Sequence, residues 1–453
     1  MLSISLIVVR VGENDRAAGV CPRRRCGVDT SMSKNKNPQK KTTPITDFRS
    51  FGLHPLLERG VRDAGFEKPR PIQAEALPAG LDGLDVLGLA QTGTGKTAAF
   101  ALTLLDWILR ERKRGIQALV LAPTRELATQ IDAETRTLAR HTKLKTAVIF
   151  GGVPKSRQIR QLRQQPEIVI GCPGRILDLM QEGYLDLGGV EGVVLDEADQ
   201  MFDMGFLPGV RKILGAIPQE RQNLLFSATM PAQLRKLADE LLHEPHVVDL
   251  AGTAPAATID HGLVRVAEQR KRPLLLHMLE QTRSHRAIVF TRTKHRAKRL
   301  AGQLKKAGHR ATDLQGNLSQ SQRDRAMGGF RDHRFDILVA TDIAARGIDV
   351  SGVSHVINFD VPNTPEQYTH RIGRTGRSEA TGRAYTFVTE NDLSWLKATE
   401  RRIGQPIRRE EVAGFPDQAQ TQTPAAAPAI GANRANRRNA RPSQPRRRNS
   451  NKR

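Results

Sequence analysis

The sequence VLGLAQTGTGKT at residues 86–97 determines the fold of the chain around it. Its first five residues form a short aliphatic run, which is typical of a buried parallel strand. Gly93 and Gly95 follow, and they allow backbone N–H groups to turn inward around phosphate oxygens at the start of a helix. Lys96 is placed to reach the β- and γ-phosphates of a nucleotide, and Thr97 to bind Mg²⁺. The pattern therefore predicts a strand, a phosphate-binding loop and a helix.

A second apolar run supplies the acidic residues that a nucleotide-hydrolysing site requires. Residues 193–199 read VVLDEAD, so Asp196 and Glu197 come directly after an aliphatic segment. Asp196 is placed to hold Mg²⁺, often through water, and Glu197 to polarise the attacking water. A cluster of acidic residues alone is equally typical of a solvated loop or a helix cap. The apolar strand that leads into this cluster favours the catalytic interpretation.

Short apolar runs alternate with amphipathic segments along most of the chain. Those of the first half are residues 86–90, 118–122, 147–150, 168–171, 193–195 and 224–227, and those of the second half are 263–266, 287–291, 337–341, 355–359 and 384–388. This alternation predicts an α/β fold with parallel sheets. We expect one domain over residues 45–250 and another over 260–415. Residues 251–259 are small and poor in helix formers, which favours a linker.

The charge of the chain favours binding to polyanions. Its 453 residues include 71 Lys and Arg against 47 Asp and Glu, a net charge of 71 − 47 = +24. Residues 416–453 are predicted to be a disordered tail, and the part from 418 onward holds nine basic and no acidic residues. The part of the chain before residue 418 therefore has a net charge of 24 − 9 = +15. A basic surface retained for solubility would give the same sum, so the charge alone does not identify a partner.

The small number of cysteines indicates a reducing compartment, which we expect to be the cytoplasm. Cys21, Cys26 and Cys172 are too few to form a disulfide framework. No stretch approaches the length of a membrane span, so no membrane partner is expected. Residues 1–44 are predicted to be a disordered arm. Because Met32 opens a polar, Lys-rich segment, we hypothesise that residues 1–31 are an upstream extension of the reading frame.

The tetrad DEAD at residues 196–199 resembles the motif that names the DEAD-box RNA helicases. Further segments resemble the motifs of that family in the same order, over roughly residues 45 to 410. The resemblance implies two tandem RecA-like domains, ATP and Mg²⁺ as cofactors, and RNA bound with little sequence specificity. Residues 91–100 (QTGTGKTAAF) and 204–208 (MGFLP) resemble the bacterial RhlE-type group within the family.

The resemblance also implies a set of nucleotide contacts. Residues 65–73 (GFEKPRPIQ) resemble the adenine-reading Q motif, with Arg70 where the family has Thr. Gln73 would bond the adenine edge and Phe66 would stack on the ring, although core packing is the alternative for Phe66. The implied nucleotide-binding residues are Phe66, Gln73, Gly93, Thr94, Gly95, Lys96, Thr97 and Asp349, and the implied catalytic residues are Lys96, Glu197, Arg374 and Arg377. Residues 370–377 (HRIGRTGR) would supply Arg374 and Arg377 as arginine fingers.

RNA contacts are implied for loops that follow strands, where ligands bind in open α/β folds. The carrying segments are residues 123–128 (PTRELA), 151–152 (GG), 172–175 (CPGR), 288–292 (IVFTR), 320–323 (QSQR) and 340–349 (ATDIAARGID). The implied RNA-binding residues are Arg125, Gly152, Arg175, Thr291, Arg292, Arg323 and Thr341. Cys172 replaces a family Thr, which removes one hydroxyl. Residues 227–229 (SAT) resemble the motif that links hydrolysis to strand separation, and the implied coupling residues are Ser227, Thr229, Asp199 and His370.

The function implied by the resemblance is an RNA-dependent ATPase that closes its two domains around RNA and unwinds short duplexes or remodels RNA–protein complexes. Two alternatives stay open at the level of sequence. One is an RNA clamp that binds ATP with poor turnover, against which Glu197, Arg374 and Arg377 argue. The other is a DNA-directed translocase, because phosphate contacts do not distinguish DNA from RNA and only the 2′-hydroxyl would. Ribosomal or RNA-decay proteins are the partners that we expect.

Overall fold

The computed structural model describes residues 47–91, 93–111, 113–250, 259–281, 286–345, 352–375 and 382–415, without the side chains of Ile343 and Glu366. The N-terminal arm, the Arg-rich tail and all but the last residue of the expected linker lie outside these ranges. Among the described residues, no helix is both long enough and apolar enough to span a membrane.

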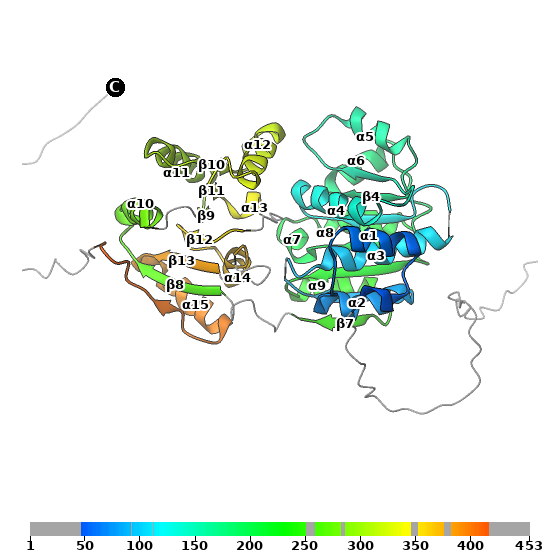
Figure 1. The fold of residues 1–453 in the computed structure, drawn as a ribbon, viewed down its shortest axis with the longest axis horizontal. Helices are drawn as coiled ribbons and strands as arrows, with labels where there is room; N and C mark the ends of the chain where they lie inside the picture. Colours follow the sequence, from blue (N-terminus) through cyan, green and yellow to red (C-terminus); the bar gives the residue numbers. More distant parts are fainter. Residues whose placement is uncertain are drawn as a thin grey trace, which may run out of the picture. The chain divides into compact units, whose positions relative to one another are not determined.

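The first sheet has seven strands, all parallel, in the order β3-β4-β2-β5-β6-β1-β7 (Figure 1). Its strands are β1 (Val86–Leu89), β2 (Ala118–Leu121), β3 (Thr146–Ile149), β4 (Ile168–Gly171), β5 (Gly192–Leu195), β6 (Gln222–Ser227) and β7 (His246–Asp249). The apolar runs noted in the first half of the sequence form β1 to β6. The chain crosses the sheet in one direction from β1 to β3 and in the opposite direction from β3 to β7, so both faces of the sheet carry helices.

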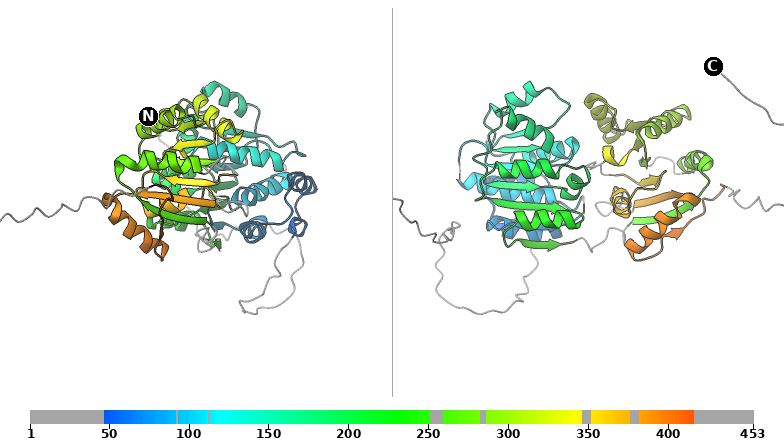
Figure 2. Two further views of the ribbon diagram at one scale, coloured as in Figure 1. Left: turned by 60° about the vertical axis from the view of Figure 1, so that its left-hand side comes forward. Right: turned by 180° about the vertical axis from the view of Figure 1, so that it is seen from behind.

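Helices cover both faces of this sheet (Figures 1 and 2). A short 3-10 helix η1 (Phe48–Phe51) precedes the helices of one face, α1 (Pro55–Asp63), α2 (Pro71–Leu81), α3 (Lys96–Glu111) and α4 (Arg125–Leu138). The other face carries α5 (Lys155–Leu162), α6 (Pro173–Gln181), α7 (Ala198–Asp203), α8 (Leu207–Gly215) and α9 (Ala232–Leu241). Successive strand residues serve opposite faces, so Val86 packs in the first core and Leu87 in the second.

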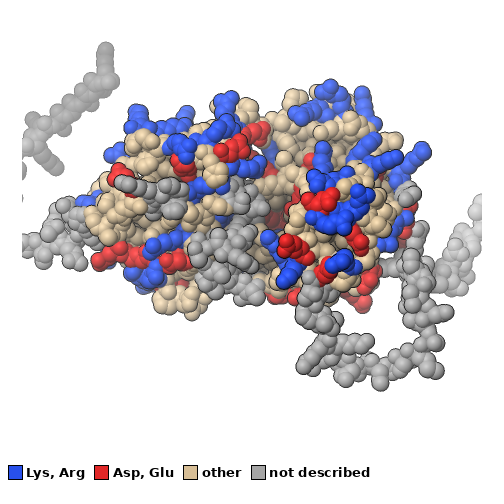
Figure 3. All heavy atoms as spheres, in the orientation of Figure 1, with Lys and Arg blue, Asp and Glu red and all other residues tan. Residues whose placement is uncertain are grey.

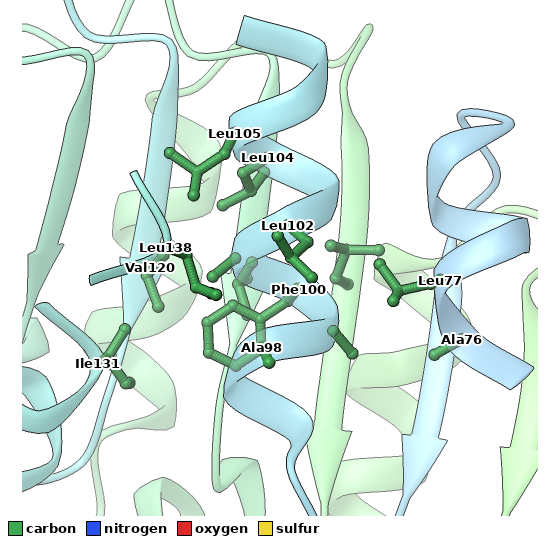
Figure 4. Packing of buried hydrophobic residues seen from close by; sticks show 14 of the residues in the cluster. Ala76, Leu77, Ala98, Phe100, Leu102, Leu104, Leu105, Val120, Ile131 and Leu138 are labelled. Carbon is green, nitrogen blue, oxygen red and sulfur yellow. The ribbon is translucent and has the colours of Figure 1, made fainter. Parts of the chain in front are cut away.

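Helix α3 lies at the centre of the first core, between α2 and α4 (Figure 4). Eleven of its 16 residues are buried. Phe100 packs against Phe226 of β6, with ring centroids 5.6 Å apart. A helix that is buried on most sides is held firmly by its neighbours. This packing fixes Lys96, the first residue of α3, at the carboxyl edge of the sheet.

The second sheet repeats the plan of the first, with seven parallel strands in the order β10-β11-β9-β12-β13-β8-β14. Numbered from its own first strand, this order is identical to that of the first sheet. The strands are β8 (Ile259–Arg265), β9 (Ala287–Phe290), β10 (Ala311–Leu314), β11 (Ile337–Ala340), β12 (His355–Asn358), β13 (Gly382–Val388) and β14 (Arg408–Arg409). The expected α/β class with parallel sheets is confirmed.

Helices flank the second sheet in the same manner. One face carries the 3-10 helix η3 (Glu268–Arg270), α10 (Lys271–Gln281) and α11 (Lys294–Lys306). The other carries α12 (Gln320–Arg331), α13 (Asp342–Ala345), α14 (Pro365–Ile372), the 3-10 helix η4 (Glu390–Asp392) and α15 (Leu393–Ile403).

Three strands have no counterpart among the apolar runs, and all three lie at sheet edges. They are β7 with the sequence HVVD, β10 with ATDL and β14 with RR. An edge strand is flanked on one side only and needs no continuous apolar run, so its sequence carries a weaker signal. The expected linker is one residue too long. Its last residue, Ile259, is the first residue of β8.

Gly60 provides a test of the packing between α1 and α4. A Cβ at this position would lie 2.0 Å from the backbone oxygen of Leu138. Because a backbone carbonyl cannot rotate away, we expect Gly60→Ala to destabilise the protein by about 1–3 kcal/mol. The midpoint of thermal unfolding measures this effect. As the control, Gly215→Ala in α8 meets open space and should leave the midpoint unchanged or raise it. Equal midpoints for the two variants would contradict the contact.

Candidate functional site

The candidate site lies where β1, β6 and β5 end, because these three strands are neighbours in the first sheet. Carboxyl ends of parallel strands meet at one edge, and ligands of open α/β folds bind there. The glycine-rich loop follows β1, the acidic residues follow β5, and residues 227–229 follow β6. The sheet order thus brings together segments that are far apart in the sequence.

Lys96 and Asp196 are both buried at this edge. The Nζ atom of Lys96 lies 3.9 Å from Oδ1 of Asp196 and donates a hydrogen bond to the backbone oxygen of Ala90 at 2.9 Å. Their side chains are only 5% and 2% exposed. Burial raises the pKa of Asp196 to about 6, an effect that the neighbouring Lys96 opposes.

The glycine-rich loop needs glycine for two reasons. Gly93 and Gly95 have φ angles of +87° and +94°, which side chains other than glycine rarely adopt. A Cβ on Gly95 would also lie 2.6 Å from Nε2 of Gln73. Thr94 closes the turn by donating from Oγ1 to the oxygen of Gln91 at 2.8 Å. The two glycines therefore allow both the tight turn of the loop and the close approach of Gln73 to Gly95.

The segment expected to read adenine binds this loop directly. Gln73 is buried, and its Nε2 donates to the oxygen of Gly95 at 3.1 Å while its Oε1 accepts from the N–H of Arg70 at 2.8 Å. Arg70 in turn donates from Nη1 to the oxygen of Gly93 at 2.7 Å. Sequence reasoning treated Arg70 only as a departure from the family pattern. The structure gives it a contact with the phosphate-binding loop.

Phe66 lies against the first core, as the packing alternative predicts. Its ring meets Phe48 edge to face, with centroids 5.7 Å apart and planes at 89°. Phe48 is buried, whereas Phe66 is only partly buried. One part of the Phe66 ring therefore packs in the core and another part stays accessible.

Glu197 has an uncommon backbone conformation. Its φ and ψ are both 50°, in the left-handed region that costs a residue other than glycine of order 1 kcal/mol or more. Its N–H donates to Oδ1 of Asp196 at 2.9 Å, and its side chain is 2% exposed. Strain of this kind persists where the surrounding structure imposes it, and here it turns the chain sharply between β5 and α7.

The four expected coupling residues form one cluster. Oδ2 of Asp199 accepts from both the N–H and the Oγ1 of Thr229, each at 2.9 Å. The N–H of Asp199 donates to Oγ of Ser227 at 3.2 Å, and this hydroxyl donates to the oxygen of Thr229 at 2.7 Å. Nε2 of His370, in α14 of the second sheet, lies 3.9 Å from Oδ2 of Asp199.

The Arg-rich segment that begins in α14 and continues past its end at Ile372 is held by buried contacts. Arg371 bonds both carboxylate oxygens of Asp342, at 2.5 and 2.7 Å, and the backbone oxygen of Asp360 at 2.6 Å. Arg374 is 5% exposed, and its Nε donates to the oxygen of His370 at 3.2 Å. Arg371 and Asp342 were missed as site residues, although both occur within quoted motifs. Asp349 and Arg377 lie outside the described residues.

Three expected RNA-contact residues of the first sheet lie together. A Cβ on Gly152, whose φ is +79°, would lie 2.0 Å from Nη1 of Arg125. Arg175 donates from Nη1 to the oxygen of Val153 at 3.1 Å and to Oε1 of Gln158 at 3.3 Å. Sequence reasoning did not single out Gln158, which is buried at the start of α5 and gave no signal of its own.

The expected RNA-contact residues of the second sheet differ in accessibility. Arg323 donates to Oε1 of Glu126 at 2.7 Å, and Gln320 beside it accepts from Arg125 at 2.7 Å. Arg292 is half-exposed. In contrast, Thr341 is 9% exposed and Thr291 has no exposed surface.

The side-chain oxygens at this edge are of the kind that bind Mg²⁺ together with a nucleotide. Among the described residues, no three His, Cys, Asp or Glu side chains lie close enough together to hold a metal ion by themselves. Mg²⁺ needs no such group, since it is usually bound by one or two protein oxygens together with phosphates and water. Asp196 and the partly buried Thr97 provide oxygens of this type beside the phosphate-binding loop.

Comparisons of the sequence with protein families give two matches. Residues 70–237 match the family model described as DEAD/DEAH box helicase, and residues 270–379 match the helicase conserved C-terminal domain. The ATP-dependent RNA helicase CshA of Listeria monocytogenes is 44% identical over 368 residues, which are 80% of this chain and 71% of the relative. The DEAD-box ATP-dependent RNA helicase CshA of Bacillus subtilis is 44% identical over 80% of this chain and 73% of the relative.

Solved structures resemble the described fold. Dbp5 of S. cerevisiae bound to RNA and ADP BeF3 matches with a TM-score of 0.74 and 33% identity, over 80% of this chain and 95% of that chain. Mss116p bound to ssRNA and AMP-PNP matches with a TM-score of 0.76 and 26% identity, over 82% of this chain and 80% of that chain. The two sheets are therefore tandem RecA-like domains.

Cys172 offers a test of the environment next to the candidate RNA loops. Burial raises the pKa of its thiol to about 12, assisted by Glu126 and opposed by Arg125. The thiol therefore stays protonated near neutral pH. In a Cys21→Ser, Cys26→Ser background, we expect a disulfide reagent at pH 8 to modify the native protein on the order of 10²-fold more slowly than the unfolded protein. Similar rates for the two would contradict this environment.

Proposed function

The chain belongs to the DEAD-box family of ATP-dependent RNA helicases, and we propose that its ATP site combines the loops after β1 and β5 with the Arg-rich segment that follows α14. It is an enzyme that uses ATP to unwind RNA. The observation that carries the assignment of the site is the buried contact between Lys96 and Asp196, at the ends of two strands that flank β6. We place the domains at residues 45–250 and 259–415, joined by residues 251–258, because Ile259 begins β8 and does not belong to the linker.

The loop after β1 binds the phosphates of ATP. Backbone N–H groups around Gly93 and Gly95 face the phosphate oxygens, and Lys96 leaves Ala90 to bind the β- and γ-phosphates. Phe66 and Gln73 bind the base. Asp349, outside the described residues, binds the ribose.

Hydrolysis requires a positioned water and stabilisation of the charge that develops on the phosphoryl group. Thr97 and Asp196 hold Mg²⁺, which when bound neutralises charge on the phosphates. Glu197 orients the attacking water and accepts its proton. Arg374 and Arg377 stabilise the negative charge on the γ-phosphoryl oxygens, a role that needs only their guanidinium groups within reach. The Asp342 carboxylate positions this segment through Arg371.

The cluster around Asp199 transmits the state of the nucleotide to the RNA. It connects the loop after β5, the loop after β6 and His370 through a short chain of hydrogen bonds and one longer contact. Loss of the γ-phosphate removes the group beside Glu197 in the proposed site. Because Glu197 caps helix α7 and Asp199 lies in the first turn of that helix, a shift of Glu197 would reach Asp199. Each member of the cluster acts here through its neighbours and not on the phosphate.

RNA contacts come from loops of both domains. Arg125, Gly152 and Arg175 form one group in the first domain, and Arg292, Arg323 and Thr341 contribute from the second. Backbone and Arg contacts with phosphates carry affinity without sequence information. Thr291 has no exposed surface, so we propose that it shapes its loop through the bond of its hydroxyl to the oxygen of Thr293 at 3.4 Å.

Finer assignments rest on the sequence motifs. We propose that the chain groups with the RhlE-type helicases, on residues 91–100 and 204–208, although the relatives described above bear the name CshA. We also propose the cytoplasm as its location and ribosomal or RNA-decay proteins as partners. A phylogeny that places the chain within the CshA group would reject the first of these assignments.

Glu197 provides the main test of the catalytic assignment. We expect Glu197→Gln to lower the RNA-stimulated ATPase rate by about 10²–10⁴-fold, because the amide cannot accept the proton of the attacking water. The rate is measured with RNA and with DNA of the same sequence. Glu220→Gln, at an exposed position after α8, is the matched control and should keep the wild-type rate. An active Glu197→Gln would remove this residue from the mechanism.

The Arg-rich tail provides a test of non-specific RNA anchoring. Residues 418–453 contain nine basic and no acidic residues. We expect a chain truncated after Asp417 to bind RNA more weakly, with a salt dependence that is flatter by about 0.7 in log–log slope for each phosphate that the tail would otherwise neutralise. Titrations of RNA at several salt concentrations measure both quantities. If the slope stays the same, the tail does not bind phosphates.

A further inference from the structure

Helix α5 and the residue that ends it carry three arginines at a spacing of three. These are Arg157, Arg160 and Arg163, and all three are exposed. A helix turns about 100° per residue, so the three side chains fall within about a third of a turn. The opposite side of α5 buries Gln158 and Leu162. The helix therefore buries one side against the domain and presents a basic side to solvent.

The charge of these arginines is not compensated locally. Some other arginines of the first domain pair with acids, as Arg110 does with Asp106 and Arg136 with Asp132. Lys155, at the start of α5, contacts the carboxylates of Asp178 and Glu182. Within the described ranges, in contrast, no carboxylate lies at ion-pair distance from Arg157, Arg160 or Arg163. Figure 3 shows Lys and Arg atoms gathered along the part of the first domain where α5 lies.

Helix α5 is anchored to the loops proposed to contact RNA. It follows Gly151 and Gly152 after only two residues. Its buried Gln158 donates from Nε2 to the oxygen of Phe150 at 2.7 Å and accepts at Oε1 from Nη1 of Arg175 at 3.3 Å. The arginine row therefore begins next to the candidate RNA loops and leads away from them along the helix.

We propose that Arg157, Arg160 and Arg163 form a second RNA-contact surface, which binds the phosphates of RNA that extends beyond the loops around Gly152 and Arg175. This proposal rests on the RNA contacts assigned above. The row spans about 9 Å along the helix axis, which is enough for a few phosphates of one strand. The surface adds affinity for long RNA and leaves the ATPase site untouched.

The composition of this surface favours a nucleic acid over a protein. Binding sites for proteins combine arginines with aromatic anchors, mainly Trp and Tyr, in well-packed pockets. The exposed large hydrophobic residues among those that the structure describes are Leu84, Tyr184, Val247 and Leu393, and none belongs to α5. Cations without apolar neighbours suit a polyanion, whose phosphates release counterions when they are neutralised.

The test compares two charge-neutralising triple variants of the full chain. The first is Arg157→Gln, Arg160→Gln, Arg163→Gln. The control is Lys212→Gln, Arg235→Gln, Lys236→Gln, at exposed positions of α8 and α9 without a described ion pair. Each is titrated with a single-stranded RNA of roughly six nucleotides, which fills only a core site, and with the same RNA extended well beyond the range of single-domain site sizes. Salt is varied in every titration.

We expect the α5 variant to bind the long RNA about 10- to 100-fold more weakly at low salt, with a log–log salt slope flatter by about 2. Its affinity for the short RNA and its ATPase rate with short RNA should equal those of the control. A third variant with lysine at the three positions should restore most of the binding to long RNA, because phosphate neutralisation needs only the charge.

Three results would overturn the proposal. The first is an α5 variant that binds long RNA as tightly as the control does. The second is an α5 variant whose affinity falls equally for short and long RNA. The third is a lysine variant that fails to recover binding to long RNA. Arg175→Ala separates this proposal from the one on which it rests. If Arg175→Ala weakens both RNAs, the core contacts stand whatever the α5 variant does. If it weakens neither, the core assignment fails independently.

Discussion

The site depends on keeping a lysine and a carboxylate side by side in a place that water barely reaches. Removing one partner of a buried pair leaves an uncompensated charge and costs about 3–5 kcal/mol, whereas the intact pair contributes little net stability. Lys96 and Asp196 are therefore retained for what they do and not for the fold. The apolar packing of α3 against α2, α4 and the sheet offsets their desolvation and holds Lys96 at the strand ends. The other loops of the candidate site, after β1 and β6, lie at the same sheet edge as this pair.

Burial explains why some of the fold is visible in the sequence. Central strands such as β2 and β5 are covered on both faces, and their apolar runs are continuous. The edge strands β7, β10 and β14 carry polar residues, so no run marks them. Identical strand order in the two domains means that each places its functional loops at the same edge. Order cannot be read from the runs themselves, because it depends on which strands pair.

The site residues follow the same distinction. The meeting of Lys96 and Asp196 at one sheet edge was predictable, because each follows an apolar run within a recognisable loop motif. Partners that act through one contact were not, as Gln158 and Arg70 illustrate, since a glutamine or arginine at such a position is common on any surface. Arg371 and Asp342 fall between these cases. Both stand inside recognisable motifs, yet their pairing with each other becomes evident only in three dimensions.

In the proposed site, Gln73 would connect recognition of the base with the shape of the glycine-rich loop. Its amide uses one N–H on Gly95 and one oxygen lone pair on Arg70, which leaves one donor and one acceptor. That remainder complements the N7 acceptor and the N6 amino group of adenine, whereas guanine offers acceptors at both positions. An engineer who altered Gln73 to accept a guanine analogue would disturb the loop with the same substitution. In the proposed site, a single substitution of Gln73 would therefore not suffice to change which nucleotide base is accepted. Acceptance of a different base would require redesign of both the segment around Gln73 and the glycine-rich loop.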